Sequence, residues 1–502
     1  MFALTILLTS RRAMKTIVIG STKHLILALI YASLGITVAL LAVGVWLLNS
    51  RPELDIWHTT QLTSQYNRSL ELTNFTEYQK LEKQLFEELE SEIYSHTSGP
   101  HSSILNRYVH GSLAAPEKWR NDWNRTYEWP LDDAKFGVLL LHGMSDSPYA
   151  LSHVAKHFEG KAHLLGLRLP GHGTIPSGLV DLEWQDMASA VSLATRHMRD
   201  VLKGRPLYVV GFSTGAALAL NHELERLSKS QERDYAGMIF ISPAIGLPPV
   251  AAGAKWQARL GQMLGLEKLS WNSIQTEYDP FKYNSFAVNA GDVVYRLAER
   301  NQAIMDMLSA EQLLSMPPIL SFQSITDATV SSLSVISDLY LRLPDNGHQL
   351  VMFDINRTQV NMGLIPHDPL TPISGVINKE NLPFDFTLIE NIDAVNEDRR
   401  RVQATTHSAD MGLKVTSLTQ RWPRNVYSLS HVALPFPIED SLYGPEGVHF
   451  IERVQIGAAS SRGERGVLSV PAAEILRQKW NPFFPYTIQK MDDFLLSLEN
   501  EP

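Results

Sequence analysis

The stretch LYVVGFSTGAALAL, residues 207–220, decides the fold. An apolar run leads into Gly-Phe-Ser-Thr-Gly, and a string of alanines and leucines follows. This order predicts a buried strand that turns abruptly into a helix, with Ser213 at the turn. Gly211 and Gly215 leave room for backbone that a larger side chain would block. We therefore expect Ser213 to be held up and exposed at the N-terminus of the helix.

Short apolar runs separated by segments of helical length recur from residue 136 onward. They are mostly continuous rather than alternating, which is typical of strands buried on both faces of a parallel sheet. Their alternation with helices predicts a doubly wound α/β architecture with a mostly parallel sheet. The predicted strands lie within residues 136–143, 162–171, 207–213, 237–244, 317–325 and 348–356.

Composition narrows the class of protein. A chain of 502 residues with 44% hydrophobic residues can bury a large core, as one domain with insertions or as two to three smaller domains. The 44 basic and 53 acidic residues give a net charge of −9 without a basic run in the soluble part, which argues against nucleic acid as a partner. Cysteine is absent, which excludes disulfides, thiolate catalysis and cysteine-based metal sites.

The N-terminal region predicts a membrane anchor. Residues 25–48 carry no charge and, at about 1.5 Å per residue, are long enough to cross a bilayer core of roughly 30 Å. Basic residues without acidic ones in residues 1–24 predict that this segment is cytoplasmic and that the rest of the chain is extracytoplasmic, on the periplasmic side of the inner membrane in a bacterium. A cleaved signal peptide is the alternative, but its apolar region would be shorter and would end in a small-x-small site. Synthesis could also start at Met14.

Residues 49–130 form a juxtamembrane region. Within residues 75–93, apolar side chains recur every three or four positions between Lys and Glu, which predicts an amphipathic helix. Such a helix could be a stalk or a partner-binding helix. The stripe is too short for a coiled coil, so we favour a helix that packs on its own domain.

A serine that attacks a carbonyl needs N–H donors for the oxyanion that forms. The sequence LLLHGMSDSP, residues 139–148, follows a predicted strand, and Gly143 allows a tight turn there. This geometry predicts an oxyanion hole made by the backbone N–H groups of Met144 and Thr214. We interpret His142 as a structural residue beneath this loop.

Three segments together resemble the α/β-hydrolase superfamily, in the branch of monoacylglycerol lipases, small carboxylesterases and serine aminopeptidase-like hydrolases. They are VLLLHGMSDSPYAL, LRLPGHGTIPSGLVDLEWQDM and VVGFSTG. The resemblance covers residues 136–245 strongly, and residues 317–356 and the C-terminal helix more loosely. It implies a hydrolase domain over residues 131–502, with a helical cap at 246–316 and a late insertion at 357–425 that the family pattern lacks. Amphipathic stretches at 254–271 and 293–314 suit the cap.

The resemblance also implies an acid and a base for the serine. In this superfamily the acid follows the strand after the cap, which favours Asp327. An N-cap role for Asp327 and Asp354 as the acid remain open. Residues 425–431, NVYSLSH, read as a further strand that ends at a histidine, and they resemble the histidine loop of small carboxylesterases. We therefore favour His431, with His348 and His449 as alternatives.

These expectations combine into a membrane-anchored serine hydrolase that cleaves a carboxylic ester, small or lipid-like, through Ser213, His431 and Asp327. No metal and no cofactor is expected. A serine aminopeptidase-like hydrolase using the same triad is one alternative. The other is a non-catalytic, anchored interaction protein.

Overall fold

A computed structural model describes residues 24, 26–44, 46–47, 50–97, 104–247, 266–358, 363, 365–377, 381–392, 400–408, 412–445, 453–457 and 477–499. The chain divides into two compact units, Met1–Glu53 and Leu54–Pro502. In the first, the helix Ile26–Gly44 has a mean hydropathy of 2.5 and side chains that are exposed within its unit. Its length and composition make it a candidate membrane span.

The second unit is built on a ten-stranded sheet with the strand order β1-β3-β2-β4-β5-β8-β9-β10-β11-β12. From β3 to β10 every neighbouring pair is parallel, whereas β1, β11 and β12 pair antiparallel. The strands are β1 (Tyr127–Trp129), β2 (Gly137–Leu141), β3 (His163–Leu167), β4 (Leu207–Phe212), β5 (Gly237–Ile241), β8 (Ile319–Ser324), β9 (Gln349–Phe353), β10 (Asp385–Asn391), β11 (Arg401–Ser408) and β12 (Gly412–Arg421). The predicted strands correspond to β2, β3, β4, β5, β8 and β9, so the predicted doubly wound sheet is confirmed.

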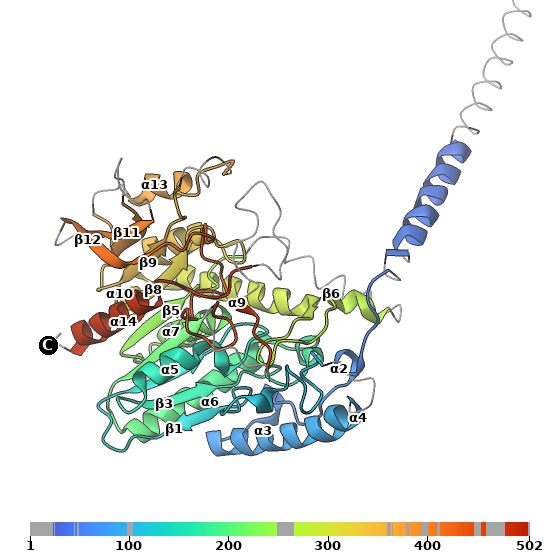
Figure 1. Cartoon of the computed structure of the whole chain (residues 1–502), viewed down its shortest axis with the longest axis horizontal. Helices are drawn as coiled ribbons and strands as arrows, with labels where there is room; N and C mark the ends of the chain where they lie inside the picture. The colour runs from blue at the N-terminus through green and yellow to red at the C-terminus, as the bar shows by residue number, and fades with distance from the viewer. Residues whose placement is uncertain are drawn as a thin grey trace, which may run out of the picture. The chain divides into compact units, whose positions relative to one another are not determined.

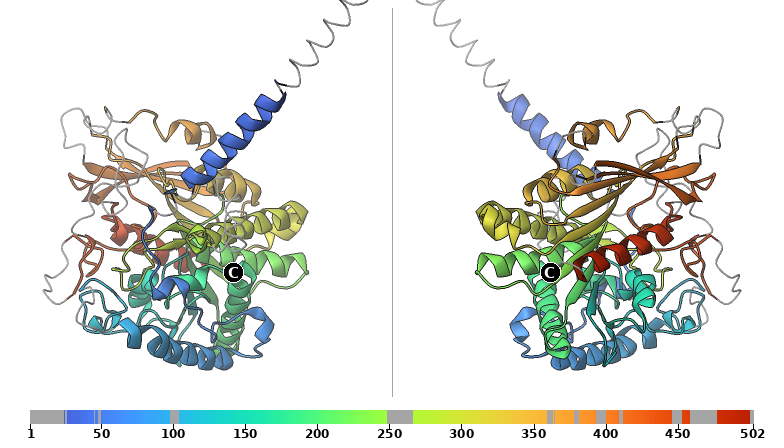
Figure 2. Two further views of the ribbon diagram at one scale, coloured as in Figure 1. Left: turned by 90° about the vertical axis from the view of Figure 1, so that its right-hand side faces the viewer. Right: turned by 90° about the vertical axis from the view of Figure 1, so that its left-hand side faces the viewer.

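Helices cover both faces of the sheet (Figures 1 and 2). Alternate residues of one strand enter opposite cores: Leu207 and Val209 of β4 join one hydrophobic cluster, and Tyr208 and Val210 join the other. The first cluster is closed by α6 (Trp184–Leu202), α7 (Thr214–Ser228) and α9 (Val288–Met307), and the second by α5 (Ser152–Phe158) and α14 (Phe484–Glu499). Burial on both faces explains why the strands are continuous apolar runs.

The late insertion at 357–425 extends the sheet. Its described residues form a short helix, α13 (Thr371–Ile377), and the strands β10, β11 and β12. The expected strand at 425–430 is wrong, since these residues form turns and loop. The physical reason is that β10 pairs with β9 in parallel and occupies the position where such a strand would pair.

The region expected to be a cap, 246–316, divides into two parts. Helix α9 belongs to the sheet-covering layer, because Asn301 donates to the carbonyl of Ala217 in α7 at 2.9 Å. A small hairpin, β6 (Trp271–Ser273) and β7 (Phe286–Ala287), brackets the connecting segment 274–285. Helix α10 (Ala310–Leu314) then leads to β8. Most of the helix expected at 254–271 lies outside the described residues.

The segment 54–97 packs on the sheet of the second unit. Within it, α2 (Ile56–Thr59), α3 (Phe75–Leu89) and α4 (Ser95–Thr97) are helical. Glu82 of α3 forms a buried ion pair with Arg168 at 2.9 Å, and the hydroxyl of Tyr78 donates to the Arg168 carbonyl at 2.7 Å. The amphipathic helix therefore packs on its own domain, as favoured from the sequence.

The start of α7 lies directly against the end of β2. A Cβ built on Gly215 would sit 2.1 Å from the carbonyl oxygen of Leu141, inside the contact distance of real atoms. Because this neighbour is backbone, it has no side chain that could rotate away. Glycine at 215 thus sets the distance between helix and sheet.

We expect Gly215→Ala to lower the free energy of unfolding by at least about 2 kcal/mol, because the added methyl must push α7 and β2 apart. Gly291→Ala in α9 is the matched control, because its Cβ would meet nothing within 4 Å. That change should be neutral or stabilise by up to about 1 kcal/mol. Urea denaturation followed by circular dichroism measures both. Equal midpoints for Gly215→Ala and the wild type would contradict the close packing.

Candidate active site

Ser213 lies at the turn between β4 and α7 with φ of 52° and ψ of −113°. A positive φ is unfavourable for a residue with a side chain, and such strain costs about 1 to 3 kcal/mol. Hydrogen bonds hold the turn: the N–H of Ser213 donates to Ile241, and the carbonyl of Ser213 accepts from Ala216 and Ala244. The predicted sharp bend at Ser213 is therefore present.

Gly211 allows the end of β4 to lie close to the first turn of α7. A Cβ on Gly211 would lie 2.5 Å from both the nitrogen and the Cα of Ala216, at the first turn of α7. Together with Gly215, this explains the spacing Gly-Phe-Ser-Thr-Gly by sterics alone. Each glycine stands where backbone from another segment occupies the space of a side chain.

The expectation that Ser213 is exposed is wrong, because the residue is only 8% exposed. Loops from three parts of the chain close over this edge of the sheet. The segment after β2 contacts the segment 274–285, where the N–H of Tyr283 donates to the carbonyl of Ser145 at 2.8 Å. The third loop carries His431 and is attached to β5 through Ser242.

Asp327 and His431 lie in contact, although 104 positions separate them. His431 Nδ1 is 2.7 Å from Asp327 Oδ2, and both side chains are almost fully buried. The N–H groups of Thr329 and Val330 donate to Asp327 Oδ1, at 2.8 Å and 3.1 Å. The side-chain amide of Gln323 donates to Oδ2 at 3.0 Å. The carboxylate thus closes a local turn and contacts His431 at once, whereas the N-cap of the following helix, Ser332–Ser334, is Ser331 and not Asp327.

These contacts decide the charge of Asp327. Burial alone raises the pKa of a carboxyl group, but the charge of His431 and the hydrogen bonds from His431, Val330 and Thr329 outweigh burial. The pKa of Asp327 therefore lies below its ordinary value, so the group is ionised at neutral pH. An ionised carboxylate accepts a hydrogen bond from the Nδ1–H of a neutral imidazole, and Nε2 of that imidazole is then free to act as an acceptor.

The loop of His431 is anchored to the ends of three core strands. Asn356, just after β9, donates through its backbone N–H to Tyr427 at 2.7 Å and through its amide to Val426 at 3.0 Å. The hydroxyl of Ser324 in β8 donates to the carbonyl of Leu429 at 2.7 Å. The imidazole lies against Phe212, with ring centroids 5.4 Å apart. His431 is therefore held beside the residue that precedes Ser213.

The expected oxyanion donors lie on neighbouring segments. Met144 is in the turn closed by the bond from Asp146 N–H to the Gly143 carbonyl, and Thr214 begins α7. Within the described part of the chain, the backbone N–H groups of Met144 and Thr214 have no hydrogen-bond partner. The contact of Gly215 with Leu141 brings the two segments together.

The segment 274–285 clamps the turn at residues 143–146, the oxyanion turn, which carries the expected oxyanion donor Met144. Besides the bond from Tyr283 to Ser145, Lys282 Nζ lies 2.6 Å from Asp146 Oδ1. Ser145 has φ of 64°, so this turn is strained as well. Sequence reasoning missed Lys282 and Tyr283, because no local pattern indicates which loop a connecting segment will contact.

A small cavity adjoins the candidate triad. Phe212 and Val432, the neighbours of Ser213 and His431, form part of its wall. Asp146, Lys282, Phe436, Tyr443 and Lys479 complete the lining. The lining is thus partly aromatic, with a carboxylate and two lysines at its polar side.

A buried carboxylate supports this wall from behind. Asp440 Oδ2 contacts the hydroxyl of Tyr149 at 2.8 Å and His153 Nε2 at 2.7 Å. Asp440 Oδ1 accepts the backbone N–H of Tyr443 at 2.6 Å. The segment that follows His431 is thereby fixed to the helical layer of α5.

The alternative residues lie in other environments. His142 is buried, accepts the N–H of Leu169 at 3.0 Å and is a structural residue, as expected. Asp354 is paired with Arg357, whose Nη2 is 2.9 Å from Asp354 Oδ1. His348 accepts the N–H of Ile319 at the start of β8, the opposite end of the strand from Asp327. His449 lies outside the described residues.

The arrangement of possible metal ligands can be stated as well. Across the described ranges, no group of three or more His, Asp or Glu side chains is arranged to hold a metal ion.

Residues 138–354 match the model of the alpha/beta hydrolase family, a span that includes the oxyanion turn, Ser213 and Asp327. The sheet unit has the α/β-hydrolase fold. No curated protein matches the sequence.

Several solved structures are similar to the chain. A monoacylglycerol lipase from Paleococcus ferrophilus is 16% identical, with a TM-score of 0.35, over 46% of this chain and 88% of that one. A monoglyceride lipase from Saccharomyces cerevisiae is 14% identical, with a TM-score of 0.36, over 45% and 81%. A carboxyl esterase from Bacillus coagulans is 14% identical, with a TM-score of 0.34, over 45% and 83%.

The buried His348 gives a prediction about acid stability. Burial lowers the pKa of His348 to about 4 from an ordinary value of 6.5. Between these values the unfolded chain takes up a proton that the folded chain refuses, so stability falls as the pH drops. His348→Asn keeps an acceptor for Ile319 and removes the titration. It should reduce the loss of unfolding free energy between about pH 7.5 and pH 5 by about 2 kcal/mol.

Denaturation at the two pH values measures this effect. The exposed His96, changed to Asn, is the matched control and should leave the acid loss unchanged. An acid loss in His348→Asn as large as in the wild type would contradict the assignment of His348 as a buried neutral residue.

Proposed function

We propose that this α/β-hydrolase cleaves carboxylic esters, with Ser213 as nucleophile, His431 as general base and Asp327 as the group that orients His431. The observation that carries the proposal is the hydrogen bond between His431 Nδ1 and Asp327 Oδ2 beside the strained turn at Ser213. A carboxylate, an imidazole and a hydroxyl in this order form the arrangement that activates a serine. The backbone N–H groups of Met144 and Thr214 are the proposed oxyanion hole.

The chemistry follows from the proton positions. The Nδ1–H of His431 donates to the Asp327 carboxylate, so Nε2 of His431 takes the proton of Ser213 as the serine oxygen attacks the ester carbonyl carbon. The carbonyl oxygen becomes an oxyanion, which the N–H groups of Met144 and Thr214 stabilise. His431 then protonates the departing alcohol and leaves an acyl-serine. Water, deprotonated by His431, hydrolyses this acyl-enzyme to the carboxylic acid and free Ser213.

An ester is favoured over the N-terminus of a peptide by the charges at the cavity. An aminopeptidase must bind an ammonium group, for which a carboxylate is the natural partner. Asp146 is the carboxylate in the cavity lining, and Lys282 already neutralises it at 2.6 Å. The aromatic and aliphatic side chains of Phe212, Val432 and Phe436 suit an acyl group instead.

Labelling with a fluorophosphonate tests the nucleophile, because only an activated serine reacts. We expect the wild type to be labelled, Ser213→Ala to be unlabelled, and Asp327→Asn to lose roughly 10⁴-fold in turnover. His348→Asn is the matched control and should retain both labelling and turnover. Labelling of Ser213→Ala at the wild-type rate would refute the nucleophile, and an unlabelled wild type would favour a non-catalytic interaction protein.

A substrate panel tests the bond type. p-Nitrophenyl esters should be turned over, and aminoacyl arylamides should not. The reverse preference would establish the aminopeptidase alternative on the same residues.

We also propose that the helix Ile26–Gly44 anchors the enzyme, with the α/β-hydrolase unit outside the cytoplasm. At about 1.5 Å per residue, its 19 residues span about 28 Å. The basic residues that precede it support an N-terminus on the cytoplasmic side. An alkaline phosphatase fused after residue 60 should be active in a bacterial host and remain in the membrane fraction. Activity recovered in the soluble periplasm would indicate a cleaved signal peptide, and an inactive fusion would reverse the orientation.

A further inference from the structure

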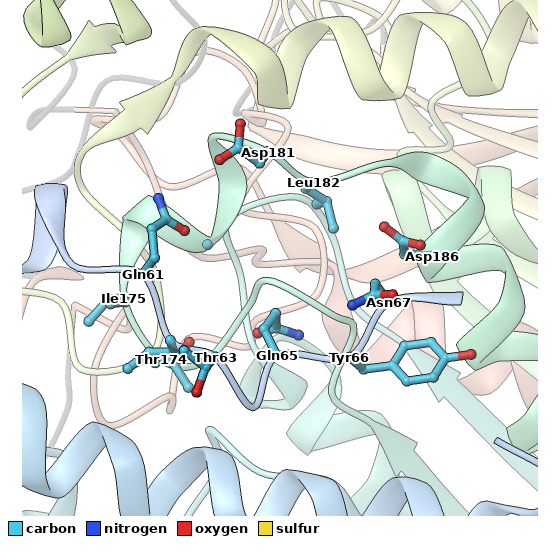
Figure 3. Close-up of a pocket in the computed structure, with 12 residues that line it drawn as sticks. Gln61, Thr63, Gln65, Tyr66, Asn67, Thr174, Ile175, Asp181, Leu182 and Asp186 are labelled. Atoms are coloured by element: carbon cyan, nitrogen blue, oxygen red, sulfur yellow. The ribbon is translucent and has the colours of Figure 1, made fainter. Parts of the chain in front are cut away.

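A second cavity lies where the juxtamembrane segment meets the segment before α6 (Figure 3). Its volume is about 210 Å³, the space of roughly seven water molecules. One wall comes from residues 61–67 and the other from residues 174–186. The residues that line it belong to neither the candidate triad nor the oxyanion turn.

The walls of this cavity are fixed by hydrogen bonds. Ser177 donates to the carbonyl of Thr60 at 2.6 Å, and the N–H of Arg68 donates to Asp186 at 2.9 Å. On the outer side, Glu88 accepts the N–H groups of Thr63 and Ser64, at 2.6 Å and 2.8 Å. The segment 61–67 is thus attached at both ends and along its middle. The cavity is therefore preformed, which lowers the entropic cost of binding a ligand.

The polar groups of the lining determine which ligand fits. Gln61, Gln65 and Asn67 contribute amides, and Asp181 and Asp186 contribute carboxylates. The amide ends of Gln65 and Asn67 point toward one another in Figure 3. Tyr66, Ile175 and Leu182 add apolar atoms, which lie on different sides of the cavity in Figure 3. No lysine, arginine or histidine is part of this lining as the structure describes it.

Charge excludes one class of ligand and hydrogen bonding excludes another. Two carboxylates in a lining that holds no basic side chain repel phosphate and other anions. An ammonium group would suit Asp186, but it has only donors. The buried Nε2 of Gln65 has no partner among the described residues and needs an acceptor. A hydroxyl group satisfies both, since it donates to a carboxylate and accepts from an amide.

We propose that this cavity is a binding site for an uncharged, hydroxyl-rich ligand, such as a single sugar ring. Ring hydroxyls would pair with Gln65, Asn67 and Asp186, and the apolar atoms of the ring would lie against the side chains of Ile175 and Leu182. The site would let the enzyme hold a glycan or a sugar headgroup independently of the ester at Ser213. A ligand of this size, with few buried atoms, is expected to bind in the millimolar range.

The test uses the full chain in a polyoxyethylene detergent, because alkyl glycoside detergents carry the proposed ligand. Saturation-transfer NMR with D-glucose, D-galactose and N-acetylglucosamine as probes should detect binding of at least one sugar. Ethanolamine and inorganic phosphate serve as the cationic and anionic probes and should not bind. Gln65→Leu should weaken sugar binding roughly five-fold or more, because it removes the unpaired donor.

Gln231→Leu, at an exposed position of the same unit, is the matched control and should bind sugar as the wild type does. Fluorophosphonate labelling of Ser213 should be equal in both variants, which separates this site from the catalytic one. The proposal is overturned if no sugar binds even at sugar concentrations well above the millimolar range. It is also overturned if ethanolamine or phosphate binds instead, or if both glutamine variants bind sugar equally.

Discussion

The turn at Ser213 is the constraint on which the rest of the site depends. A φ of 52° at a residue with a side chain persists only where surrounding contacts hold it, and here the Ile241, Ala216 and Ala244 backbones do so. The turn also requires close approach of three backbones, which Gly211 and Gly215 permit. The same geometry that strains the backbone directs the N-terminus of α7 toward the edge of the sheet, where its dipole favours negative charge.

The insertion at 357–425 does not disturb the edge of the sheet where Ser213 lies, because its first and last residues lie close together. Asn356 follows β9, and its hydrogen bonds to Val426 and Tyr427 join the start of the insertion to its end. The additional strands β10, β11 and β12 continue the sheet outward, away from β4. His431 therefore lies at the end of the core strands, although the insertion separates it from β9 in the sequence. A sheet can accept added strands at its border without altering strands already paired inside it.

The sequence predicted those features that depend on local pattern. Continuous apolar runs identified the strands β2, β3, β4, β5, β8 and β9, because burial on both faces requires them. The space that a sharp strand-to-helix turn requires identified Gly211 and Gly215, and both glycines have close backbone neighbours in the structure. The pairing of Asp327 with His431 required knowledge of a family, since nothing local distinguishes one buried histidine from another. The contacts of Lys282 and Tyr283 with the oxyanion turn, and the low exposure of Ser213, depend on loop paths that no periodicity encodes.

Burial of Asp327 explains why so many polar groups converge on it. A carboxylate taken out of water loses several kcal/mol of hydration, which an unpaired group would avoid by taking up a proton. The N–H groups of Thr329 and Val330 and the amide of Gln323 supply hydrogen bonds that do not depend on His431. The bonds from Val330 and Thr329 lower the pKa of Asp327, in addition to the larger effect of the charge and the hydrogen bond of His431. A neutral imidazole beside an ionised carboxylate is the state a general base needs before it accepts a proton. The groups around Asp327 therefore support the carboxylate charge on which the proposed role of His431 as a general base depends.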